Sequence, residues 1–146
     1  MKKSYLLLLL TSVITADPEL YFIEPKDGET YPKEVAVKFG LKDFGVAPAG
    51  YNIPNTGHHH LIINADLPDL TLPIPANENY VHFGLGQTET TLTLEPGTYS
   101  LQLLMGNYLH IPHEKPLFSE VISITCLLYT SPSPRDQVVS RMPSSA

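Results

Sequence analysis

Turn-forming residues divide this chain into short segments, and this division limits the folds it can adopt more than any other feature. Its 146 residues include 14 prolines and nine glycines, which interrupt regular secondary structure. Between them, apolar and polar residues alternate with the period of a half-buried β-strand. In residues 34–39, for example, Val35, Val37 and Phe39 share one face. No window has an amphipathic helical period, so we expect an all-β protein.

Seven segments have strand character. They comprise residues 20–23, 34–39, 61–65, 80–83, 88–94, 98–105 and 119–125. Turn signals separate these segments at short intervals, which favours an immunoglobulin-like antiparallel β-sandwich with Greek-key connections. A Greek-key barrel is the alternative.

Two connections lead to separate predictions. Residues 95–97, Glu-Pro-Gly, have the composition of a tight turn, so residues 88–94 and 98–105 are expected to form a hairpin. Residues 66–79 form a proline-rich connection that is long for a compact domain. We therefore expect this connection either to have a function or to cross from one sheet to the other.

Both ends of the chain differ from the domain between them. Residues 1–16 begin with two lysines, continue with a leucine-rich run and end in a small residue, which is typical of a secretory signal peptide. The run is too short to span a bilayer. Residues 127–136 resemble the translation of a sequencing-adapter read-through, and residues 131–146 lack a strand or helix period. The tail is taken to begin at residue 126. We interpret residues 126–146 as a disordered, artefactual tail, with a natural disordered tail as the alternative. Residues 17–125 are then the domain of a periplasmic or secreted protein.

This domain is strongly acidic. Residues 17–125 contain five lysines, no arginine and 14 carboxylates, which give a net charge of −9 with neutral histidines. Such a surface repels phosphate backbones and anionic lipid headgroups, so we expect neither nucleic-acid binding nor membrane insertion after signal cleavage. It attracts cations. The single cysteine, Cys126, cannot form an internal disulfide and is assigned no role.

All six histidines lie in three short segments. They are His58, His59 and His60 in the first, His82 in the second, and His110 and His113 in the third. Residues two apart on a strand lie about 6.6 Å apart on one face. His58 and His60 can therefore face outward and converge on one ion, while His59 faces the core and is expected to donate a hydrogen bond there. The later histidines are candidates to complete the site.

Three functions remain open on these residues. The first is a small binding domain that holds copper or zinc, which favour imidazole ligands. Its expected metal ligands are His58, His60, His82, His110 and His113. The second is a metal-free cell-envelope module whose histidines form a hydrogen-bonded network that orders the loops, with an envelope component as partner. The third and least favoured is a metalloenzyme; no Gly-x-Ser-x-Gly motif occurs, and no catalytic residue is assigned.

Several motifs together resemble a known family. They are the stretch Asn55-Thr56-Gly57-His58-His59-His60-Leu61, His82-Phe83-Gly84 with residues 86–92, Pro96-Gly97 with residues 101–104, and His110-x-Pro112-His113. Through these motifs, residues 22–125 resemble the DUF4399 domain of bacterial exported proteins. The resemblance implies a single exported domain without an established activity. It also implies that members of that family more often have an acidic residue at the position where this sequence has Asn107.

Overall fold

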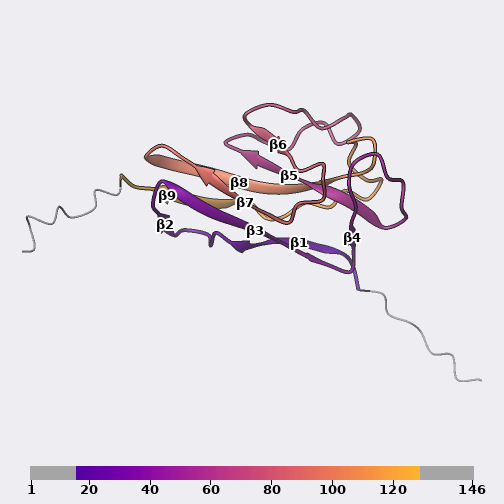
Figure 1. Cartoon of the computed structure of the whole chain (residues 1–146), viewed down its shortest axis with the longest axis horizontal. Helices are drawn as coiled ribbons and strands as arrows, with labels where there is room; N and C mark the ends of the chain where they lie inside the picture. Colours follow the sequence, from indigo (N-terminus) through magenta and orange to yellow (C-terminus); the bar gives the residue numbers. More distant parts are fainter. Residues whose placement is uncertain (1–15, 129–146) are drawn as a thin grey trace, which may run out of the picture.

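The computed structural model describes residues 16–128, which form two β-sheets packed face to face (Figure 1). The strands are β1 (Glu19–Glu24), β2 (Thr30–Tyr31), β3 (Glu34–Lys42), β4 (Gly45–Val46), β5 (Thr56–Ile63), β6 (Tyr80–His82), β7 (Glu89–Thr93), β8 (Gly97–Gly106) and β9 (Ile122–Cys126). Within these residues no helix is long and apolar enough to cross a membrane. The predicted signal peptide, apart from its last residue, and residues 129–146 of the predicted tail lie outside them. Cys126, the first residue assigned to the tail, is the last residue of β9 and is buried in the core.

The strands divide unequally between the two sheets. One sheet contains β1, β3 and β7 in that order, and the other has the order β2-β9-β8-β5-β4, with β6 also paired to β5. Most pairs are antiparallel, whereas the short β2 and β4 run parallel to β9 and β5. The predicted immunoglobulin-like, all-β sandwich is confirmed, and all seven predicted strands are present. β2 and β4 are additional strands of two residues each.

The main hydrophobic core lies between the sheets. Val35 and Val37 of β3 face Leu61 of β5 and Leu101 and Leu103 of β8, and all five side chains are fully buried. Burying each of them stabilises the fold by about 1.5–3 kcal/mol. The core positions follow the alternation in the sequence, because every second side chain of a strand points between the sheets. This core holds β5 rigidly in place.

The predicted hairpin between β7 and β8 is wrong. β7 pairs with β3, whereas β8 pairs with β5 and β9, so the intervening turn carries the chain from one sheet to the other. The Tyr99 hydroxyl donates a hydrogen bond to the Glu95 carbonyl oxygen at 2.9 Å, like the tyrosine corner of immunoglobulin-like domains. Turn composition cannot distinguish the two arrangements, because both require the same local reversal of the backbone.

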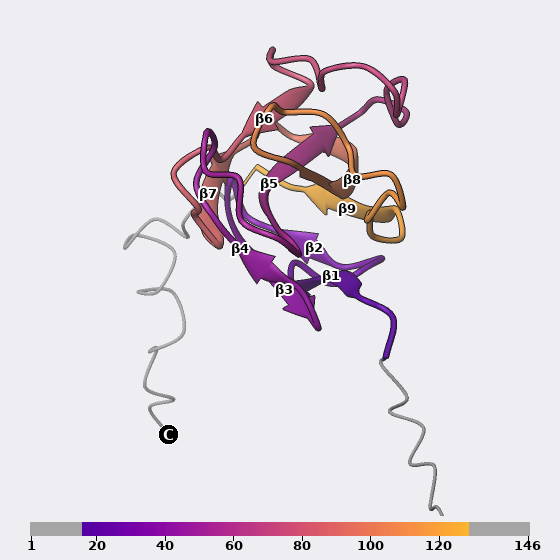
Figure 2. The same ribbon diagram turned by 90° about the vertical axis from the view of Figure 1, so that its right-hand side faces the viewer.

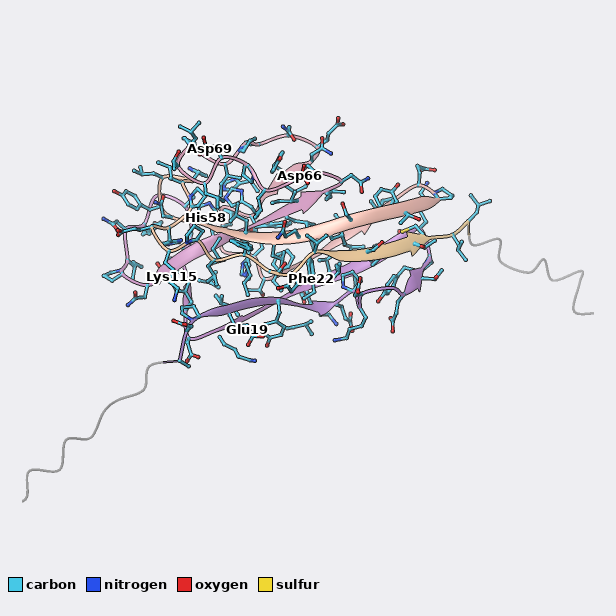
Figure 3. The ribbon with its side chains drawn as sticks, turned by 180° about the vertical axis from the view of Figure 1, so that it is seen from behind. Glu19, Phe22, His58, Asp66, Asp69 and Lys115 are labelled. Carbon is cyan, nitrogen blue, oxygen red and sulfur yellow. The ribbon has the colours of Figure 1, made fainter. Side chains whose placement is uncertain are left out.

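The long connection between β5 and β6, residues 64–79, stays within one sheet. β6 pairs with β5, so the connection does not cross between sheets. It instead lies over the outer face of β5 (Figure 2), where Ile74 packs against Ile62 and Leu104 in a second, smaller core. Figure 3 shows Asp66 and Asp69 of this connection on the same side of the sandwich as His58. The outer face of β5 is therefore buried.

Candidate metal site

Strand β5 places its three histidines in two different environments. His59 faces the main core, where its ring centroid lies 4.8 Å from that of Phe39. His58 and His60 lie on the other face, as the alternation of the strand predicts. Neither is at the surface, however: residues 64–79 cover this side of β5, and both side chains are almost fully inaccessible to solvent. The outward orientation expected from the sequence is thus corrected to a buried one.

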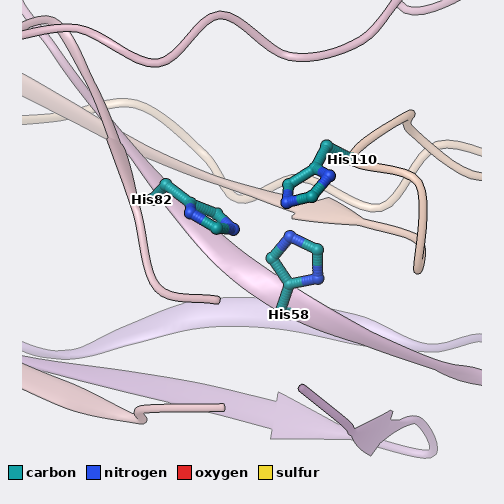
Figure 4. Close-up of side chains that lie close together, drawn as sticks. All are labelled: His58, His82 and His110. Carbon is teal, nitrogen blue, oxygen red and sulfur yellow. The ribbon is translucent and has the colours of Figure 1, made fainter. Parts of the chain in front are cut away.

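His58, His60, His82 and His110 form one group, here called the histidine cluster. Strand register places His82 of β6 beside His60, and the loop after β8 brings His110 over the same face. The rings of His82 and His110 lie 4.9 and 5.0 Å from that of His58 between centroids. One ring nitrogen of each of these three faces the space between them (Figure 4), and the three nitrogens lie within 4.8 Å of one another. Three histidines are therefore close enough to hold one metal ion.

His60 adjoins this group of three. Its Nε2 lies 3.0 Å from Nε2 of His58, and its ring centroid lies 5.0 Å from that of His82. A Cβ atom on Gly106 would lie only 2.8 Å from Nε2 of His60, and one on Gly84 would overlap the His82 ring. Both positions thus require glycine to leave room for an imidazole. The His82-Phe83-Gly84 motif therefore ends in glycine for a steric reason.

Asn107 orders the loop that carries His110. Its side-chain oxygen accepts hydrogen bonds from the backbone N–H groups of Leu109 at 2.8 Å and Ile111 at 3.2 Å. His110 lies in the left-handed region with φ of 64°, which is uncommon for a residue with a side chain. Its carbonyl oxygen accepts a hydrogen bond from Ile74 N–H at 2.7 Å. The loop of His110 is thereby tied to the connection that covers β5.

His113 occupies a different position from the other candidate ligands. Its Nε2 lies 2.9 Å from the carbonyl oxygen of Thr56. Because a carbonyl only accepts, this nitrogen carries the proton and donates it. The ring packs edge-on against Phe44 at 5.1 Å between centroids. His113 thus braces the start of β5, which the spacing of His110 and His113 in the sequence does not reveal.

Burial keeps the imidazoles of His58 and His60 neutral. It is the main cause that lowers the pKa of His58 to about 4 and that of His60 to about 3, with further contributions from the neighbouring histidines. Burial and the neighbouring His110 also lower the pKa of His82. Neutral imidazole is the form that binds a metal, so binding at pH 7 would need little proton release. Nδ1 of His58 and of His60 is buried without a protein hydrogen-bond partner, which in native proteins is rare and often indicates a bound ion or water.

His59 lies apart from the cluster, with the Gln87 backbone as its polar neighbour. Neither ring nitrogen has a partner within hydrogen-bonding distance and angle, so the hydrogen bond expected inside the core is absent. Burial lowers the pKa of His59 to about 4, although the nearby Gln87 backbone acts to raise it.

Replacing His59 with leucine should therefore stabilise the domain. We expect the free energy of unfolding at pH 7 to rise by about 1–3 kcal/mol, because an apolar side chain removes the cost of burying unpaired nitrogens. Urea denaturation measures this change. The substitution should leave metal affinity unchanged, since His59 faces away from the histidine cluster. A loss of stability would show that His59 has a polar partner in solution.

Comparison with protein families identifies the domain. The sequence profile described as "Domain of unknown function (DUF4399)" matches residues 37–127. The chain belongs to the DUF4399 family. The matched region contains all six histidines, so the histidine cluster lies within the family domain. At Asn107 of this DUF4399 domain, an aspartate oxygen could accept the same two backbone hydrogen bonds, so an acid there is consistent with a structural role. No curated protein matches the sequence.

One solved structure shows a likeness to this DUF4399 domain. It is the X-ray structure of the endo-β-1,4-mannanase from Thermotoga petrophila, at 17% sequence identity and a TM-score of 0.46. The alignment covers 78% of this chain and 20% of that chain, so the DUF4399 chain spans about a fifth of the length of the mannanase. A likeness at this level transfers no activity.

Proposed function

We propose that this DUF4399 domain binds a divalent transition metal, copper or zinc, at the histidine cluster of an exported protein. The observation that carries the proposal is the convergence of His58, His82 and His110 from three separate segments, with ligand nitrogens within 4.8 Å of one another. In a network that served only to order loops, the ring nitrogens would pair with carbonyls or carboxylates. Nδ1 of His58 and of His60 has no such protein partner.

The donor atoms favour copper or zinc. Calcium and magnesium prefer oxygen ligands, whereas imidazole suits copper, zinc and nickel. The Nε2 atoms of His58 and His60 lie 3.0 Å apart. This contact places a fourth imidazole next to the three that could hold an ion, and imidazole is a ligand that copper and zinc favour.

The cluster is accessible from one side. His58 is buried, His110 is partly buried and His82 is exposed. His60 lies beside His58 under residues 64–79. An ion would therefore enter and leave past His82, without any rearrangement of β5 in the core. The negative charge of residues 17–125 favours the approach of a cation.

Titration of the full chain with Cu²⁺ and Zn²⁺ by isothermal calorimetry tests this proposal. We expect a dissociation constant below about 10 μM for at least one of the two ions. Metal at about 100 times that constant should stabilise the fold by about 2.7 kcal/mol, and a chelator should reverse the gain in melting temperature. If neither ion binds more tightly than about 10 μM, the metal-binding proposal is wrong.

A metal-free envelope module is the second candidate. The observations that favour it are the close contact of His58 with His60 and the hydrogen bond from His113 to Thr56. Both could order loops without an ion. This function predicts a melting temperature that neither metal nor chelator changes, so the same titration separates the two candidates. Export itself is tested by locating the protein in fractionated cells.

A further inference from the structure

A pocket that the proposed function does not use shares Asn107 with the loop of His110. It has a volume of about 230 Å³ and is formed by residues 51–56, residues 107–108 and His113. Its polar lining is dominated by Tyr51, Asn52, Asn55, Asn107 and Tyr108. No charged side chain lines it. Asn107 connects the two sites, because the same residue lines the pocket and orders the loop of His110.

Hydrogen bonds hold the walls of this pocket in place. The backbone N–H of Gly50 donates to the Tyr108 carbonyl at 3.0 Å, which joins the two loops. The Thr56 hydroxyl donates to the Ile53 carbonyl at 2.8 Å. The His113 ring then donates to the Thr56 carbonyl. A ligand would therefore find the pocket already formed and would not incur the entropy cost of ordering these loops.

The side chains that line the pocket match a ligand rich in hydroxyl groups. Each asparagine amide offers both a donor and an acceptor, as a hydroxyl group requires. Asn107 uses its oxygen within the loop, which leaves its amide nitrogen to donate. Tyrosine adds a flat apolar ring with a polar end, and loops rich in tyrosine and asparagine are typical of recognition surfaces. Tyr51 is 64% exposed and so is available for contact.

The two loops that form the pocket contain no charged residue, whereas Glu114 and Lys115 line the adjoining pocket that shares Asn55 and His113 with it. Lysine, arginine, aspartate and glutamate are all absent from residues 44–65, 70–77, 79–88 and 96–113, which include both loops of the pocket and the whole histidine cluster. The 14 carboxylates of residues 17–125 lie outside these segments. A charged ligand would lose hydration in the pocket without gaining an ion pair from a residue that lines it, which favours a neutral ligand.

We infer that this pocket binds one ring of a neutral polysaccharide. Tyr51 and Tyr108 contact the apolar faces of the sugar, and the three asparagines bond to its hydroxyl groups. The pocket is smaller than those that take drug-sized ligands, which fits a single sugar ring with the rest of the chain in solvent. The site stands independently of metal binding.

Calorimetric titration of the full chain with cellohexaose, mannohexaose, xylohexaose and chitohexaose tests this inference. We expect at least one of them to bind with a dissociation constant of about 0.1–1 mM. Tyr51→Ala should weaken that binding at least about tenfold, and Asn52→Ala should weaken it about threefold. Both side chains are exposed, so the melting temperature should not change.

Leu85→Ala is the matched control. Leu85 is 82% exposed and uncharged, in the loop after β6, but does not line the pocket. Its removal should leave sugar binding unchanged, as should a chelator or His58→Ala. The inference is overturned if none of the four oligosaccharides binds with a dissociation constant below about 5 mM, or if Tyr51→Ala binds as tightly as the natural sequence. A chelator removes metal from the histidine cluster without affecting the sugar pocket. The sugar titration can therefore support or overturn the inference even if the domain binds no metal.

Discussion

Replacing His58 with alanine is expected to lower the affinity of the domain for Cu²⁺ by at least about 100-fold. Loss of a residue that only supports a ligand typically costs 10–100-fold, and loss of a ligand should cost more. His58 is central to the cluster, since its ring lies 4.9, 4.9 and 5.0 Å from those of His60, His82 and His110. Competition with a chromophoric chelator measures the affinity.

His113→Ala is the matched control for this prediction. His113 is another imidazole near the start of β5, partly buried rather than fully buried, and its Nε2 bonds to the Thr56 carbonyl. Its removal should change the affinity for Cu²⁺ by less than about threefold. Equal losses in the two variants would mean that the ion binds elsewhere or that His113 turns toward it. Circular dichroism of both variants checks that the fold is retained.

Acidification is expected to destabilise the metal-free domain strongly. The pKa of His58 and of His59 is about 4 in the folded protein and that of His60 is about 3, whereas an unfolded histidine has a pKa of about 6.5. Below pH 6.5 the unfolded state therefore binds protons that the folded state excludes. The free energy of unfolding should fall by roughly 1.4 kcal/mol per pH unit for each histidine. The loss continues until the pH reaches the folded pKa values.

Urea denaturation at several pH values, with a chelator present, measures this dependence. Above about pH 7.5 the stability due to these groups is complete, because both states are then neutral at these histidines. His59→Leu should flatten the slope by about one third, because it removes one of the three groups. A free energy of unfolding that stays constant from pH 7 to pH 5 would show that the three imidazoles are not buried in solution.

The sandwich could be predicted because its strands have a local signature. Val35 and Val37 bury on one face of β3 because side chains of a strand alternate, and this alternation is visible without any partner strand. The turn before β8 was wrongly predicted to close a hairpin because strand pairing, unlike alternation, has no local signature. Whether β7 pairs with β8 or with β3 depends on which surfaces meet across the core, and that is not encoded within the turn.

The sequence by itself determined that His58 and His60 share one face of a strand while His59 takes the other, since a period of two follows from extended backbone geometry. Only the tertiary structure decided that residues 64–79 bury that face. It also decided that strand pairing places His82 beside His60, and that the loop after β8 adds His110 but not His113 to the cluster. These contacts join segments distant in the chain. They depend on strand register and loop closure, which no local pattern of residues specifies.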